Sequence, residues 1–165
     1  MKTHIFLKTA LVAGLLAISG TSFAAPSTTV TTTFTGTIAN SCSMVAGTVG
    51  TLGLSTDGKT MGTAQTNGAK GSFTLTCTGT ANMSIAEPIP NAGTTAATNI
   101  ALLTTKKSFL YLSTAPTVAI ATGDGTTTAT SKSSGTYLVD MSLASTSVLA
   151  TGDYASSVIT TVTPN

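Results

Sequence analysis

The sequence is poor in the residues on which most enzymes and nucleic-acid-binding proteins rely. It has no tryptophan, one histidine and two cysteines, and charged residues make up only 7% of it. The single histidine, His4, lies in an N-terminal stretch that we expect to be removed. Ser–His, Cys–His and His-ligated metal sites would then have no histidine to use. We therefore expect no catalytic residues, no cofactor and no bound metal.

Residues 1–24 have the features of a secretory signal peptide. Lys2 and Lys8 precede a short apolar run at 10–18, and the small residues Ser22 and Ala24 fit cleavage after Ala24. The apolar run is well short of the ~20 residues that a transmembrane helix needs. We expect the chain to pass through the periplasm and to act at the cell surface, beginning at Ala25.

The charges of the remaining chain balance. Its lysines are Lys59, Lys70, Lys106, Lys107 and Lys132, and its acidic residues are Asp57, Glu87, Asp124, Asp140 and Asp153. A chain without a basic patch is not suited to bind nucleic acid, which we exclude as a partner. Two of the carboxylates lie in turn-like stretches, "TDGK" and "GDG", where Asp typically bonds to the local backbone. A hydrolase that uses a pair of these carboxylates is an alternative that no spacing supports.

Threonine, which makes up nearly a quarter of the exported chain, alternates with apolar residues in several stretches. In "GSFTLTCTG" the side chains of Phe73, Leu75 and Cys77 share one face, and "TVTTTFTGTIANSC" alternates in the same way from residue 30 to Cys42. Period-two alternation indicates strands with one buried face. Further strands are expected at 83–87, 99–104, 108–113, 117–122, 135–143 and 154–163. Short strands separated by frequent turns favour an all-β, two-sheet sandwich.

The two cysteines lie on the apolar faces of two expected strands. Both thiols should point toward the same core, and an exported chain meets an oxidising compartment. We therefore predict a disulfide between Cys42 and Cys77, with two buried free thiols as the alternative. Closing a loop of about 35 residues would stabilise the fold by roughly 3–4 kcal/mol.

Three features resemble one protein family. The run "FTGTIANSC" places Phe34, Gly36 and Ile38 ahead of Cys42, and a second cysteine follows in the alternating strand "FTLTC". The segment "TGDYASSVITTVT" resembles the closing strand of the same family. Together these features resemble chaperone–usher pathway pilins, the major subunits of fimbriae, and the threonine-rich strands suit the archaic branch related to spore-coat U domains. The ending "TVTPN" departs from the family's usual terminal tyrosine, since Pro164 cannot donate a backbone hydrogen bond.

The resemblance implies an immunoglobulin-like β-sandwich that is incomplete and is completed by a donor strand from a neighbouring subunit. It implies a donor extension at 25–33 and a pilin-like domain at 34–165, with Phe34–Cys42 as the domain's first strand. Val30, Thr32 and Phe34 would present one face to the neighbour's groove. The groove would be lined by the C-terminal strand residues Tyr154, Val158 and Val162. The alternative is that 25–33 simply belongs to the first strand of its own domain.

The function implied by the resemblance is that of a non-enzymatic structural subunit of an extracellular pilus, which supports adhesion or biofilm formation. Its partners would be further copies of itself, a periplasmic assembly chaperone and an outer-membrane usher. A secreted monomeric module that binds carbohydrate is the alternative. Tyr111, Tyr137 and Tyr154 are the only tyrosines that could form a sugar platform, and this scarcity counts against the alternative.

Overall fold

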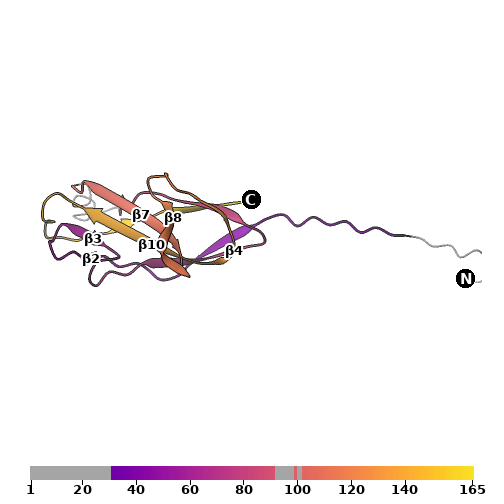
Figure 1. The fold of residues 1–165 in the computed structure, drawn as a ribbon, viewed down its shortest axis with the longest axis horizontal. Coiled ribbons are helices and arrows are strands. Elements are labelled where there is room, and N and C mark those ends of the chain that lie inside the picture. The colour runs from indigo at the N-terminus through magenta and orange to yellow at the C-terminus, as the bar shows by residue number, and fades with distance from the viewer. Residues whose placement is uncertain (1–30, 92–98, 100–101) are drawn as a thin grey trace, which may run out of the picture. The chain divides into compact units, whose positions relative to one another are not determined.

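The computed structural model describes residues 31–91, 99 and 102–165 (Figure 1). The expected signal peptide and Val30 lie outside these residues. The chain divides into two units, Met1–Gly36 and Thr37–Asn165. All the strands that the structure describes belong to the second unit.

The described part of the second unit is all-β, and its strands pair antiparallel. The strands are β1 (Cys42–Ala46), β2 (Gly53–Leu54), β3 (Thr60–Gly62), β4 (Gly71–Cys77), β5 (Ala81–Ile85), β6 (Ile89–Pro90), β7 (Thr105–Leu112), β8 (Ala115–Thr122), β9 (Ala129–Lys132), β10 (Gly135–Ala144), β11 (Ser156–Ser157) and β12 (Thr160–Pro164). This agrees with the fold class expected from the sequence.

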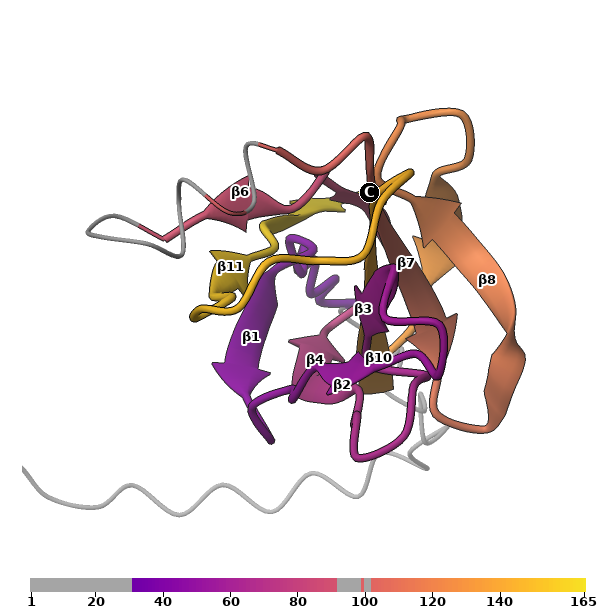
Figure 2. The same ribbon diagram turned by 90° about the vertical axis from the view of Figure 1, so that its left-hand side faces the viewer.

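The largest sheet has seven strands and is organised around β10. One edge of β10 pairs with β7, which in turn pairs with β8. The other edge pairs first with β4, at Gly135–Val139, and then with β3, at Ser142–Ala144. Beyond β4 lies β1, so β1 and β8 lie on opposite sides of the domain (Figure 2).

A second layer is formed by the three-stranded sheet β12-β5-β9 and by the pair β11-β6. The main core lies between the layers. It joins buried Leu75, Leu110 and Tyr137 of the large sheet to buried Met83 and Ile85 of β5. Two sheets that share one core in this way are consistent with a β-sandwich.

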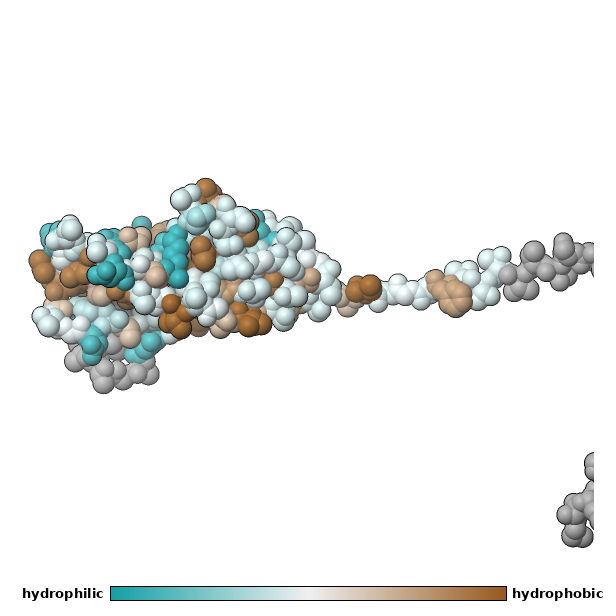
Figure 3. Space-filling model, turned by 90° about the horizontal axis from the view of Figure 1, so that it is seen from below, coloured by the Kyte–Doolittle hydropathy of each residue, from teal (hydrophilic) through white to brown (hydrophobic). Residues whose placement is uncertain are grey.

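Alternation along the strands explains which side chains are buried. In β4, Phe73 and Leu75 are buried while Thr74 and Thr76 are exposed, as the sequence predicts. Strand β5 alternates strictly between buried and exposed residues. The exposed positions of β4 and β5 are threonine, serine and asparagine. The face seen in Figure 3 is mostly pale, with separate apolar and hydrophilic patches.

The prediction that Phe34–Cys42 forms the first strand is wrong. Residues 31–41 belong to no strand, and β1 begins only at Cys42. Phe34 is 90% exposed and Ile38 is 88% exposed. The alternation of this segment makes it suitable for a sheet, but within the described residues no strand of its own chain pairs with it.

Two other expected strands also differ. The segment expected at 154–163 is divided into β11 and β12, with Val158 and Ile159 between them. The segment expected at 99–104 lies partly outside the described residues, and its last residues, 102–104, are not in a strand.

The predicted disulfide is confirmed. Cys42 and Cys77 are bonded, and they face each other directly in the β1–β4 pair with their Cα atoms 4.2 Å apart. Both cysteines pack against the main core. The bond therefore ties the edge strand β1 to its neighbour β4.

Among the residues that the structure describes, no helix has the length and apolar character required to cross a membrane.

Candidate functional site

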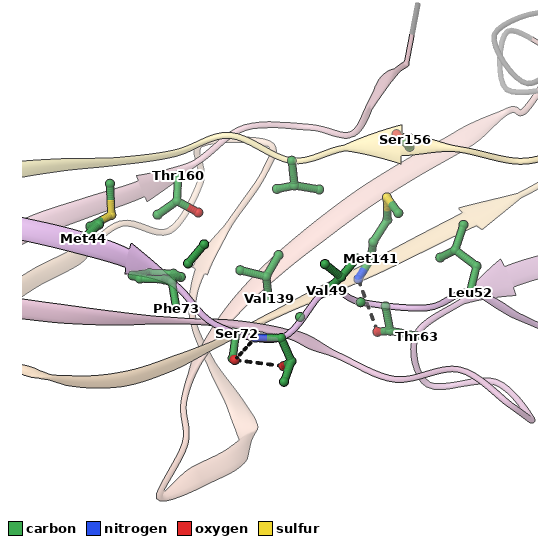
Figure 4. A pocket seen from close by; sticks show the side chains of 15 residues that line it. Met44, Val49, Leu52, Thr63, Ser72, Phe73, Val139, Met141, Ser156 and Thr160 are labelled. Atoms are coloured by element: carbon green, nitrogen blue, oxygen red, sulfur yellow. Dashed lines mark hydrogen bonds between the residues drawn. The ribbon is translucent and has the colours of Figure 1, made fainter.

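A groove lies between β1 and the C-terminal segment that contains β11 and β12. Its cavity of about 390 Å³ has Phe73, Val139 and Met141 at its base. Met44 lies on the β1 side, and Thr160 lies on the opposite side (Figure 4). The groove thus gives access to apolar side chains that a fully covered sandwich would bury.

A second cavity of about 380 Å³ continues the groove beyond β1. The two cavities share Val49, Leu52 and Met141, and the second one adds Tyr154 and Asn91. The groove therefore extends along the chain that follows β1 and along the chain that precedes β12.

On one side of the groove, β1 has an edge without a partner strand among the described residues. Thr78 N–H donates to Ser41 O and Gly47 N–H donates to Ser72 O, so the odd-numbered residues of β1 bond to β4. Backbone groups alternate in direction along an antiparallel strand. The N–H and C=O groups of Cys42, Met44 and Ala46 consequently point toward the groove.

On the other side of the groove, β12 has a similar edge. Ala86 N–H donates to Ile159 O and Asn165 N–H donates to Thr80 O, so the odd-numbered residues bond to β5. The even-numbered residues Thr160 and Val162 direct their backbone groups toward the groove. Pro164 has the same parity, so its missing N–H removes no hydrogen bond between β12 and β5.

The groove is closed at one end. There the Asn40 side chain donates to Asn165 O at 2.6 Å, which joins the chain just before β1 to the chain just after β12. The other end of the groove lies at the second cavity, near Val49 and Tyr154.

The structure places the predicted groove residues as follows. Val158 lines the first cavity and packs against both core clusters. Val162 is half-buried against the main core. Tyr154 lines the second cavity, and its hydroxyl donates to Ala150 O at 2.8 Å. Thr32 and Phe34 are exposed residues of the segment that precedes β1.

Sequence reasoning did not identify the base of the groove or the β1 side. Alternation predicts that Phe73 lies on an apolar strand face and that 135–143, which contains Val139 and Met141, is a strand, but it does not show that part of the apolar surface borders a groove. The sequence signal for Met44 and Ala46 was available, since they continue the parity of Cys42.

Sequence reasoning also missed a buried carboxylate on β10. Asp140 is only 8% exposed, accepts a hydrogen bond from the Thr63 hydroxyl, and lies 3.6 Å from Lys70 Nζ. Lys70 Nζ also donates to Pro116 O at 2.7 Å and lies 3.7 Å from the centre of the Tyr111 ring. Burial, together with the charge of Asp140, raises the pKa of Tyr111. The cluster closes the gap where β10 changes partner from β4 to β3, and we assign it a structural role.

Two exposed carboxylates serve turns, as their sequence context predicts. Asp124 accepts hydrogen bonds from the Thr122 hydroxyl and from the backbone and hydroxyl of Thr126, and these bonds lower its pKa to about 2. Asp57 accepts from the Ser55 hydroxyl and from Lys59 N–H, and its pKa is also lowered.

The tyrosines do not form an exposed platform. Tyr137 is buried and stacks on Phe73, the ring of Tyr111 is covered by Lys70, and Tyr154 is partly buried. In the described part of the chain, no group of three or more His, Cys, Asp or Glu side chains could hold a metal ion.

No protein-family model matches the chain, and comparisons with curated proteins and with solved structures also found no match.

Proposed function

We propose that the chain is a structural subunit of an extracellular pilus and that it polymerises by donor-strand exchange. The groove of one subunit accepts the N-terminal segment of the next, which completes an immunoglobulin-like sandwich. One observation carries the proposal: the chain has both an open apolar groove between two free strand edges and an unpaired segment with two almost fully exposed apolar side chains, Phe34 and Ile38.

The groove suits a β-strand better than a small ligand. Both of its sides present backbone N–H and C=O groups, which an added strand satisfies by main-chain hydrogen bonding. Its base presents apolar side chains, which alternate side chains of the added strand would cover.

The unpaired segment suits the groove. Thr32, Phe34 and Ile38 share one parity, and threonines occupy the other parity at 31–37. The donor segment therefore extends beyond the 25–33 expected from sequence and reaches Ile38, with Val30 as a member outside the described residues. An exposed, uncharged segment of this kind would otherwise promote aggregation.

The position of the groove also sets the direction of insertion. The chain enters its own domain at Asn40, at the closed end of its own groove. Ile38 is only two residues before Asn40. The domain of the donor subunit must therefore lie next to the end of the neighbour's groove that receives Ile38. The neighbour's closed end is occupied by its own Asn40. Ile38 therefore lies at the open end, the strand runs antiparallel to β12, and subunits join head to tail.

The remaining parts of the proposal follow from this assembly. The partners are further copies of the chain, together with a periplasmic chaperone that protects the empty groove and an outer-membrane usher that delivers the fibre to the cell surface. The chain has no enzymatic role, and the fibre supports adhesion or biofilm formation.

The test compares Phe34→Asp with the matched control Thr33→Asp. The two changes introduce the same charge one residue apart, on opposite faces of the donor segment. A charge buried without a partner in an apolar groove is costly, whereas a solvent-facing charge is not. We expect Phe34→Asp to abolish surface fibres seen by electron microscopy while periplasmic subunit is retained, and Thr33→Asp to assemble. Fibres of normal abundance from Phe34→Asp would refute the proposal.

A further inference from the structure

Asn40 joins three segments at the closed end of the groove. Its side-chain amide donates to Thr80 O at 2.5 Å and to Asn165 O at 2.6 Å. Its Oδ1 atom lies 3.3 Å from the Thr78 hydroxyl, whose one proton is shared between this oxygen and Ala39 O at 3.2 Å. Both amide hydrogens are therefore used, which fixes the side chain in place.

The local sequence makes room for this side chain. A Cβ atom at Gly79 would lie 3.0 Å from Asn40 Cγ, closer than an ordinary contact. The neighbouring backbone is also bonded, since Ser41 N–H donates to the Thr78 hydroxyl at 2.9 Å. Residues 78–80 thus form the surface against which the Asn40 side chain packs.

The Asn40 bridge leaves no space for a further strand. Hydrogen-bonded strands lie ~4.8 Å apart, so a strand inserted between β1 and β12 needs its two neighbours ~9.6 Å apart. The closed end is narrower than this, since some Cα atoms of β1 and β12 lie within 8 Å of each other. Beyond them, one asparagine side chain and one 2.6 Å hydrogen bond join the chain before β1 to Asn165. An inserted strand must end before it reaches this bridge.

The donor segment requires such a limit. A slip of one residue would turn its apolar side chains outward, but a slip of two residues keeps the same face toward the groove. Alternation alone therefore does not distinguish the correct register from one displaced by two residues.

We propose that Asn40 is the stop that sets the register of the inserted strand, an inference that rests on the proposed function. Val30–Ile38 and Tyr154–Val162 each contain nine residues. With the leading end of the donor against the bridge, Val30 lies beside Val162, Phe34 beside Val158, and Ile38 beside Tyr154 in the second cavity.

The experiment maps the register with a photo-crosslinking amino acid. Benzoylphenylalanine replaces Phe34 in the full exported chain, multimers are irradiated, and the cross-linked peptides are identified by mass spectrometry. The same probe is introduced into Asn40→Ala and Asn40→Asp chains, because a carboxylate keeps the size of the side chain but cannot donate to the carbonyls of Thr80 and Asn165. Ser134→Ala is the control, since it removes the hydroxyl that bonds to Cys77 N–H at 2.8 Å without bordering the groove.

In the unaltered chain and in Ser134→Ala we expect cross-links confined to the surroundings of Val158. In both Asn40 variants we expect a second set displaced by about two residues, or ~7 Å, toward Val162. Unchanged cross-links in the Asn40 variants would overturn the stop and leave the proposed function intact. The absence of any intermolecular cross-link in the unaltered chain would overturn the proposed function itself.

A second measurement does not depend on the variants. The probe placed at position 30 of the otherwise unaltered chain should cross-link to a neighbour near Asn40 or Asn165. Cross-links from this position to the middle of the groove, near Val158, would show that the strand stops short of the bridge, which would refute the proposed stop.

Discussion

Replacing Phe34 and Ile38 by alanine should weaken the contact between subunits without weakening the fold of each subunit. Phe34 is 90% exposed and Ile38 is 88% exposed in the single chain. Nearly the whole of each side chain is therefore available for burial in a neighbouring groove.

The size of the effect follows from this exposure. Complete burial of a Phe or Ile side chain contributes about 1.5–3 kcal/mol, which corresponds to roughly 10- to 100-fold in affinity. In an extended strand the two positions lie ~13 Å apart, so their effects should add. We expect the double variant to lose about 3–6 kcal/mol of contact energy.

The assay is the rate at which purified multimers dissociate into monomers at a fixed guanidinium concentration, followed by size-exclusion chromatography. Affinity changes within one interface appear mostly in the dissociation rate. Monomer unfolding is measured in parallel and should change by no more than about 0.5 kcal/mol, as for an exposed residue. The double variant Thr33→Ala with Thr37→Ala is the matched control, since both threonines lie on the other face of the segment.

Two results would refute the reasoning. Dissociation within about twofold of the unaltered chain would show that these side chains are not buried between subunits. Equal losses in monomer stability and in multimer stability would show that the segment belongs to the fold of its own domain.

Further predictions concern the domain itself. Cys42→Ser should lower the free energy of unfolding by roughly 3–4 kcal/mol in chemical denaturation, and labelling of denatured, unreduced protein should find no free thiol in the unaltered chain. Asp140→Ala should cost about 1–3 kcal/mol because it leaves the Thr63 hydroxyl and Lys70 without their buried partner, whereas the exposed Asp153→Ala should have little effect. The pKa of Asp124 falls from 3.8 to about 2 on folding. The stabilisation from its hydrogen bonds is therefore present above pH 3.8 and is lost as the pH falls toward 2. The melting temperatures of the unaltered chain and of Asp124→Asn should differ at neutral pH and converge in acid. Val158→Asp should reduce the soluble subunit level rather than fibre length alone, since Val158 packs against both core clusters.

The all-β fold class and the disulfide could be predicted from the sequence alone. Strict alternation in stretches such as Gly71–Cys77 predicts strands with one buried face, because side-chain direction in a strand has a period of two. The same parity places Cys42 and Cys77 toward one core, and the structure pairs them. Both features depend on the alternation of side chains along individual strands, and this alternation can be read directly from the sequence.

Which strands have partners could not be predicted from the sequence and is seen in the folded structure. Residues 30 to 42 alternate with a period of two, yet residues 31–41 pair with no described strand and β1 begins at Cys42. Pairing depends on which neighbours are available in space, and period-two patterning carries no information about them.

The same reason explains the groove and its closed end. Met44 and Val139 have the parity of core residues, and the sequence does not show that β1 and β12 leave them partly uncovered. Asn40 has no neighbour in sequence that would reveal its contact with Asn165, which is 125 residues away along the chain. A free edge and a closed end are properties of the packed sheets, because they arise where a strand lacks a neighbour or where distant segments meet.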